Sequence, residues 1–186
     1  MGPHLLRLSR LPVGQILFLV LLLTIAADQC SKYWASHVLQ GARPRYYLGQ
    51  TLVLDYALNP GGFLSLGSGM PDRLRPLLFI IANVFLLVGL AFFVVRKWQL
   101  SLAMRTSLTL ILAGGLGNLI DRVVNQGLVV DFVVLRFGRL QTGVFNLADV
   151  AILAGTLWVL GFVFGGAKVA NENPSSTGAV LKGDVS

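Results

Sequence analysis

The stretch LLFIIANVFLLVGLAFFVV, residues Leu77–Val95, decides the fold because Asn83 is its only strongly polar member. A helix needs roughly 20 apolar residues to cross the hydrocarbon core of a bilayer, which is about 30 Å thick. The stretch therefore predicts a transmembrane helix.

Three more runs have similar length and character: Val13 to about Trp34, about Leu102 to Ile120, and Phe145 to Phe164. Four spans predict an all-α integral membrane protein, a four-transmembrane-helix bundle within residues 1–168. From Asn171 the chain is polar and rich in Pro, Ser and Gly, which predicts a disordered tail over residues 169–186.

The composition of the 186 residues supports a membrane protein, because 55% are apolar and only 12% are charged. An average soluble domain has about 25% charged residues, and the mean hydropathy here is +0.74. These values exclude a soluble protein built around one large core, and they also exclude a disordered protein. The net charge of +7 comes from cations beside the apolar runs, with no basic stripe typical of nucleic-acid binding.

The single cysteine, Cys30, excludes an internal disulfide, and no Cys/His cluster has the spacing of zinc ligands. We therefore expect neither a metal nor another cofactor. A cleaved signal peptide is an alternative for the first run, because two arginines precede an apolar segment that ends in Ala26–Ala27. Asp28 and Lys32 extend this run and favour a retained helix.

An even number of spans places both termini on one side of the membrane. Short loops weigh most in the positive-inside rule, and the shortest loop carries Arg96–Lys97. This predicts cytoplasmic termini, although the opposite side also carries arginines. Arg136 and Arg139 are among these, and contact with anionic headgroups is one explanation for them.

Two loops outside the spans contain β-like patterns. Residues Tyr46 to Leu58 alternate imperfectly, which predicts one or two short strands, and Asn59–Gly62 has the chemistry of a turn. The β-branched run Leu128–Leu135 surrounds Asp131 and predicts a strand or a surface segment. Because an unpaired sheet edge in hydrocarbon leaves backbone groups unsatisfied, these pieces should pair or lie in the interface.

Five of the eight acidic residues lie in or against apolar runs: Asp28, Asp55, Asp121, Asp131 and Asp149. A carboxylate at membrane depth costs several kcal/mol, so such residues are functional candidates. The alternative is that each lies at a helix end and reaches the headgroups. That alternative weakens because several of them are accompanied by other polar residues in the same runs.

Helical spacing groups these polar residues. Asp28 and Lys32 are four apart and share a helix face, as an ion pair or as direct substrate contacts. Asn118, Asp121 and Arg122 form one polar face at the end of the third span. The glycines before them permit close helix packing. Such packing alone, without a functional site, is the alternative explanation for this segment.

Two aspartates have the chemistry for hydrolysis. Asp149 shares a helix face with Asn146 at the start of the fourth span, and Asp131 interrupts an apolar run. If the loop brings these carboxylates together, charge repulsion forces them to share a proton. Such a pair performs general acid/base peptide hydrolysis. The spacing permits this meeting but does not distinguish Asp131 from Asp121 as the partner.

Five segments occur in an order that resembles lipoprotein signal peptidase, the signal peptidase II family of bacterial membrane aspartyl peptidases. They extend over residues 13–166: Asp28–Gln29 with Lys32, Asn59 with Gly61, Gly114–Gly117 followed by Asn118–Arg122, Val129–Phe132, and Phe145–Asp149. The run Gly-Asn-Leu-Ile-Asp-Arg, followed by Val-Val-Asp-Phe and Phe-Asn-Leu-Ala-Asp, is highly specific.

The resemblance implies a bundle in the bacterial inner membrane with a small extracytoplasmic β-element over the site. It implies removal of signal peptides from prolipoproteins at the bond preceding a diacylglyceryl-modified cysteine. We expect the protein to work as a monomer, with membrane lipids and these substrates as its partners. The resemblance assigns roles residue by residue: Asp131 and Asp149 as the catalytic dyad, Asn59, Asn118, Arg122 and Asn146 in substrate binding, and Asp28, Lys32 and Asp121 in supporting the site.

One segment departs from the family pattern. The family follows its Asn-x-Gly with small residues and then an aromatic one, whereas here Gly62 precedes Phe63–Ser65. We expect a reshaped cradle loop that alters which precursors fit and leaves the dyad unchanged.

Two other classes of protein compete with a peptidase. A transporter or proton relay distributes polar residues along several spans, whereas here they gather at the outer ends of the first, third and fourth. An inactive binding factor with the same fold needs no pair of acids.

Overall fold

The computed structural model describes residues 12–60, 74–97 and 99–171 of the chain. In this part the elements follow the order α1 (Val13–Val38), β1 (Arg45–Tyr47), β2 (Leu52–Asn59), α2 (Leu74–Arg96), α3 (Leu102–Val124), β3 (Val129–Phe137), β4 (Leu140–Gln141) and α4 (Leu147–Asn171). The departure at Gly61–Ser65 and residues 172–186 of the predicted tail lie outside the described residues.

The predicted four-helix membrane fold is confirmed. Each helix is long and apolar enough to cross a bilayer. α1 and α3 continue four residues beyond the predicted ends of their spans, and α4 continues to Asn171, three residues into the predicted tail. Apolar runs therefore located the spans, while these helices continue past the apolar runs through mixed polar and apolar residues.

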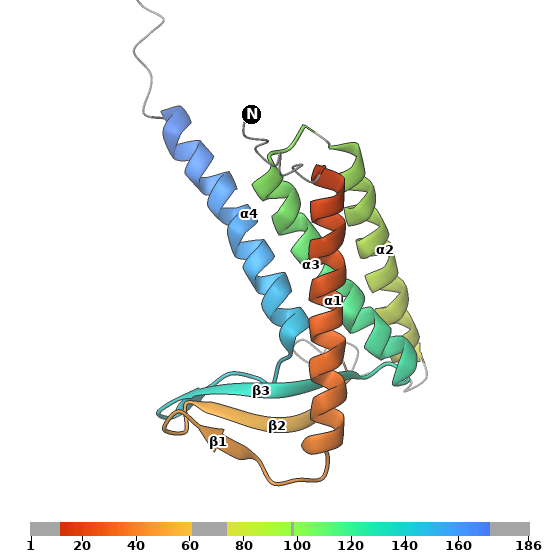
Figure 1. Ribbon diagram of the computed structural model, residues 1–186, viewed down its shortest axis with the longest axis vertical. Coiled ribbons are helices and arrows are strands. Elements are labelled where there is room, and N and C mark those ends of the chain that lie inside the picture. The colour runs from red at the N-terminus through yellow and green to blue at the C-terminus, as the bar shows by residue number, and fades with distance from the viewer. Residues whose placement is uncertain (1–11, 61–73, 98, 172–186) are drawn as a thin grey trace, which may run out of the picture.

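α3 forms the centre of the bundle and contacts the three other helices (Figure 1). Half of its spanning window is buried, against 11% in each of the others. Glycines permit this close packing: a Cβ at Gly155 of α4 would lie 2.5 Å from the Ser107 carbonyl oxygen, and a Cβ at Gly117 would lie 2.5 Å from Asp28 Oδ2. The other helices leave most of their apolar surface facing outward, as a lipid environment allows.

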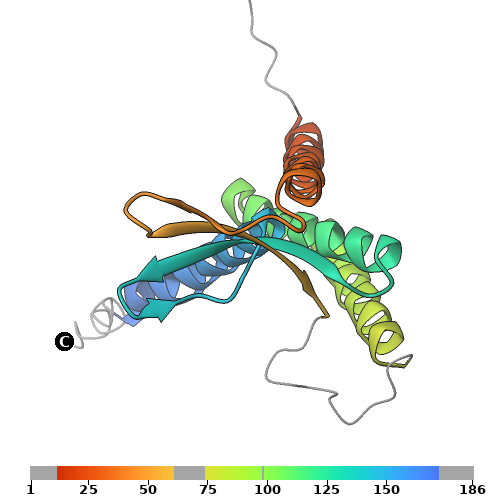
Figure 2. The same ribbon diagram turned by 90° about the horizontal axis from the view of Figure 1, so that it is seen from below.

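The antiparallel sheet has the strand order β1-β2-β3-β4. It crosses the end of the bundle at which α1 ends and α4 begins (Figures 1 and 2). A β-bulge between Leu54 and Ala57 shifts the register of β2 against β3, which bends the sheet locally. The strands predicted in both loops are therefore present, and they pair as the backbone of an interfacial segment requires.

Two contacts fix the sheet to the helices. Phe132 packs in a buried cluster with Ala35 of α1 and with Leu39, which directly follows that helix. Val133 exchanges two backbone hydrogen bonds with Phe145, each 2.9 Å long, so β3 is joined to the residues that begin α4. This second contact brings the middle of β3 beside the first turn of α4.

Candidate active site

Asn146 joins the two aspartates of the predicted dyad. Its Nδ2 donates to Asp131 Oδ1 at 2.6 Å, and its backbone N–H donates to Asp149 Oδ2 at 3.2 Å. Asp131 projects from β3 and Asp149 from the first turn of α4. Carboxylates that are 18 positions apart in the sequence thus bind a single residue.

The start of α4 fixes Asp149 locally. Asn146 immediately precedes the helix, and its Oδ1 accepts from the Asp149 backbone N–H at 2.9 Å. Together with the bond from the Asn146 backbone to the Asp149 carboxylate, this is the reciprocal pattern of a capping box. The positive end of the helix dipole also favours a carboxylate in this turn.

Asn118 connects α3 to the same pair. Its Nδ2 donates to Asp149 Oδ1 at 2.8 Å, and its Oδ1 accepts from Asn146 Nδ2 at 3.1 Å and from Lys32 Nζ at 2.9 Å. Two donors on the amide oxygen fix the orientation of this side chain, so its N–H group must face Asp149.

Asp131 is only 1% exposed. Asn59, at the end of β2, donates from Nδ2 to Asp131 Oδ2 at 2.9 Å. Burial raises the pKa of Asp131 from 3.8 to about 6; the hydrogen bond from Asn59 opposes this rise, and the charge of Asp149 adds to it. Asp131 therefore keeps its proton to a higher pH than an ordinary aspartate.

A buried charge cluster lies behind the dyad. Lys32 Nζ is 2.8 Å from Asp28 Oδ2 and 3.3 Å from Asp121 Oδ2, and all three side chains are at most 4% exposed. Asp28 Oδ1 accepts from the Ala148 backbone N–H at 2.9 Å, and Asp121 Oδ2 accepts from the Val130 N–H at 2.8 Å. Each aspartate of the cluster thus holds the residue immediately before one member of the dyad.

Arg122 lies half-buried at the edge of this network. Its Nη1 donates to the Asn118 backbone oxygen at 3.1 Å, and the negative charges of Asp149 and Asp131 attract its guanidinium group. Its Nε is buried without a hydrogen-bond partner among the described residues. A ligand oxygen beside the dyad would satisfy this donor.

Two of the cavities among the described residues lie beside the dyad and its direct partners. One, of about 400 Å³, lies between α2, α3 and α4, and its lining is mostly apolar apart from Asn83, Asn118 and Arg122. The other, of about 430 Å³, lies against α4 and β3 and reaches Asp149. Within the described residues, no group of three or more His, Cys, Asp or Glu side chains is placed to hold a metal ion.

The sequence of this site matches a known family. The family model for signal peptidase (SPase) II matches residues 20–165. The chain belongs to the signal peptidase II family. It is therefore a multi-pass membrane protein of a peptidase family.

Individual relatives agree with this assignment. The lipoprotein signal peptidase of Methylocella silvestris is 38% identical over 148 residues, which are 76% of this chain and 81% of the relative. That of Borrelia hermsii is 30% identical over 154 residues, 80% and 88% of the two chains. A solved bacterial membrane enzyme superposes with a TM-score of 0.71 over 88% of this chain and 95% of its own, at 24% identity, which shows the fold alone.

All nine predicted site residues of this family member lie in one connected network, so the structure brings them together: Asp28, Lys32, Asn59, Asn118, Asp121, Arg122, Asp131, Asn146 and Asp149. Their individual roles remain predictions. Asp55, the weakest of the acidic candidates, lies in β2 at the bulge, outside this network of nine residues.

Gln29 is a network member that the predicted set of site residues lacks. Its Nε2 lies 3.2 Å from the Gly117 carbonyl oxygen, 3.1 Å from Asp121 Oδ1 and 3.2 Å from Asp28 Oδ2. It joins α1 to α3 beside the charge cluster. The position of Gln29 next to Asp28 in an apolar run was the one sequence feature that pointed to a role in the site. Its partners on α3 could not be read from the sequence.

The charge cluster generates a stability prediction. Lys32→Met leaves two buried carboxylates without their cation, and breaking a buried ion pair costs about 3–5 kcal/mol. We expect a correspondingly lower unfolding free energy in detergent micelles. Lys97→Met is the matched control, since Lys97 is exposed at the end of α2. Equal destabilisation by both substitutions would contradict the role of the cluster.

The raised pKa of Asp131 predicts a pH-dependent stability. The folded protein binds this proton more tightly than the unfolded chain, so the contribution favours folding below the ordinary pKa and is lost as the pH rises through about 6. Melting temperatures between about pH 4 and pH 7 should therefore fall more for the wild type than for Asp131→Asn. Asn59→Ala removes a donor to the ionised carboxylate and should move the fall to higher pH. Parallel curves for wild type and Asp131→Asn would exclude the shift.

Proposed function

We propose that the protein is an aspartyl endopeptidase that removes signal peptides from prolipoproteins, with Asp131 and Asp149 as its catalytic residues. The observation that carries this proposal is the pair of carboxylates held by Asn146. Membership of the signal peptidase II family supports the peptidase activity and the class of substrate.

The two aspartates have different surroundings, which suggests different roles. Asp131 is almost fully buried with a raised pKa, so we assign it the shared proton. Asp149 is half-buried and accepts two N–H donors, so we assign it the ionised carboxylate of the pair. Asp149 is then the general base and Asp131 the general acid.

The reaction needs one water molecule and two proton transfers. The water oxygen bonds to the peptide carbonyl carbon while one water proton moves to Asp149 and the Asp131 proton moves to the carbonyl oxygen. When the C–N bond breaks, the Asp149 proton moves to the leaving nitrogen and a hydroxyl proton of the intermediate returns to Asp131. Both aspartates regain their initial states.

The substrate reaches this site within the membrane. A signal peptide and the acyl chains on a diacylglyceryl cysteine are apolar, and the 400 Å³ cavity between α2, α3 and α4 is mostly apolar up to Asn118 and Arg122. The unpartnered Arg122 Nε is suited to a peptide carbonyl oxygen beside the dyad. We place the cut bond immediately before the lipidated cysteine. The described network comes from one chain, which is consistent with a working monomer.

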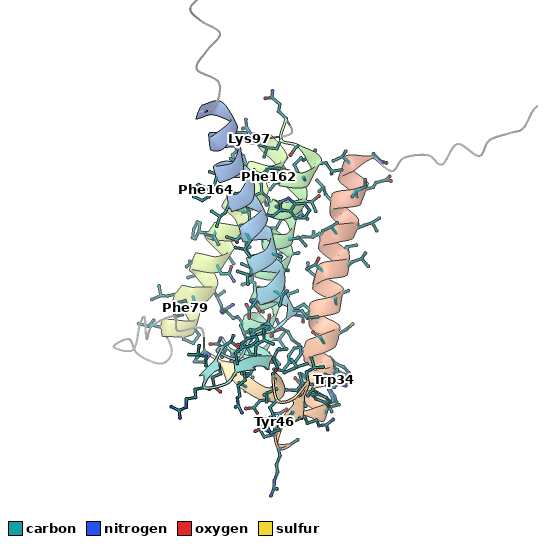
Figure 3. All side chains as sticks on the ribbon, turned by 90° about the vertical axis from the view of Figure 1, so that its left-hand side faces the viewer. Trp34, Tyr46, Phe79, Lys97, Phe162 and Phe164 are labelled. Carbon is teal, nitrogen blue, oxygen red and sulfur yellow. The ribbon has the colours of Figure 1, made fainter. Side chains whose placement is uncertain are left out.

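We also propose that the sheet and the site face the extracytoplasmic side of the bacterial inner membrane. Lys97 lies at the opposite end of the bundle from Trp34 and Tyr46 (Figure 3), and the short loop with Arg96–Lys97 favours the cytoplasm.

The orientation is tested by labelling intact cells with a membrane-impermeant maleimide. In a Cys30→Ser background, Ala42→Cys in the turn after α1 should react, whereas Gln99→Cys in the loop between α2 and α3 should not; both positions are exposed. The reverse pattern would invert the proposed topology.

The dyad is tested by Asp131→Asn and Asp149→Asn, made separately. Each should lower processing of a lipidated precursor by about 10³-fold, since an amide cannot exchange the required proton. The assay follows the loss of the signal peptide as a mobility shift with purified protein. Asp55→Asn, outside the network, should process at the wild-type rate. Substantial processing by either dyad variant, with its fold intact by melting temperature, would refute the assignment.

A further inference from the structure

The two turn ends of the sheet carry exposed apolar side chains. Leu48, in the turn between β1 and β2, is 77% exposed, and Phe137 and Leu140, on either side of the turn between β3 and β4, are 63% and 76% exposed. Tyr46 on β1 adds an aromatic ring that is 52% exposed. In water such a concentration of apolar surface on short turns is unfavourable.

Arginines accompany these apolar groups. Arg136 lies on β3 with its guanidinium carbon 5.7 Å from the centre of the Tyr46 ring, and its NH2 donates to Gln141 Oε1 at 3.3 Å. Arg139 is exposed and lies in the turn between β3 and β4. Acidic residues in the described sheet and its turns are limited to Asp55 and the buried Asp131. The turn ends therefore have a positive charge.

The position of these turns matches the boundary of a bilayer. The sheet lies across one end of the bundle, and its turns lie on the side toward which α4 leans (Figures 1 and 2). Trp34 and Tyr46 lie at this same end (Figure 3). Aromatic and basic side chains beside apolar ones are the composition of a membrane interface.

We propose that this turn-end patch, defined as Leu48, Phe137 and Leu140 with Arg136 and Arg139, binds anionic phospholipid headgroups of the surrounding bilayer. The apolar side chains enter the acyl boundary, and the guanidinium groups bind phosphate oxygens. A second protein chain is a poorer occupant for strand pairing, because the edge strands β1 and β4 have only three and two residues.

This binding would set the depth of the site in the membrane. Arg136 and Phe137 end the strand that carries Asp131, so lipid contacts at the turns hold β3 at a fixed level. The inference does not depend on the proposed catalysis, and its test needs no activity.

The experiment places a fluorescent label on the patch in reconstituted vesicles. In a Cys30→Ser background, Leu140→Cys is labelled with bimane, and quenching is compared between brominated phosphatidylglycerol and brominated phosphatidylcholine. We expect stronger quenching by the phosphatidylglycerol form and protection from aqueous iodide. Ala42→Cys, in the exposed turn after α1, is the water-exposed control.

The arginines are then removed from the labelled protein. One arginine near an anionic surface strengthens binding about fivefold, so Arg136→Gln with Arg139→Gln should lower the phosphatidylglycerol preference by about 25-fold. Arg96→Gln with Lys97→Gln, at the other end of the bundle, should not change it. Arg139→Gln alone, in an exposed turn, provides a smaller expected loss of about fivefold should the double variant unfold.

Two results would overturn the inference. Iodide quenching at residue 140 equal to that at residue 42 would place the patch in water. Lipid quenching that is indifferent to the headgroup, or that falls as the protein-to-lipid ratio rises, would indicate uncharged lipid or a second copy of the chain on the patch.

Discussion

The rest of the site depends on one buried ion cluster. Lys32 lies between Asp28 and Asp121, and each of these aspartates binds the backbone N–H of the residue that precedes a dyad member. Burying three charges is costly unless every group has partners, and here the partners come from α1, α3, β3 and the start of α4. The cluster therefore does more than neutralise charge. Together with the hydrogen bonds between Val133 and Phe145, it holds β3 beside the start of α4, and with them two carboxylates that share no local segment of chain.

Neutral amides perform the finer positioning. Asn59, Asn118 and Asn146 donate hydrogen bonds to the dyad without adding a positive charge beside it. An amine or a guanidinium in direct contact would stabilise both ionised carboxylates and favour loss of the shared proton. The nearby cations bind Asn118 and form no ion pair with the two aspartates: Lys32 donates to its side-chain oxygen, and Arg122 donates to its backbone oxygen. This arrangement holds the two carboxylates through neutral donors.

Local patterns account for much of what was predictable. Long apolar runs located four spans, β-branched residues around Asp131 predicted β3, and four-residue spacing predicted the contact between Asp28 and Lys32. The helix ends were less predictable, because α1 and α3 continue past the apolar runs that marked their spans. Gln29 was missed as a site residue since its partners, Gly117 and Asp121, belong to another helix. Long-range hydrogen bonds of this kind leave no periodic signal in one sequence.

The amino-acid sequence by itself determined that this chain enters a membrane and that several of its acids lie in or against apolar runs, because apolar length and charge cost are properties of single segments. The pairing of those acids was a property of the tertiary structure. Spacing left Asp121 and Asp131 as equal partners for Asp149. The fold separates them: Asp121 faces Lys32, Gln29 and the Val130 N–H, whereas β3 carries Asp131 to Asn146 at the start of α4. That choice follows from the return of β3 across the end of the bundle and its backbone hydrogen bonds to Phe145.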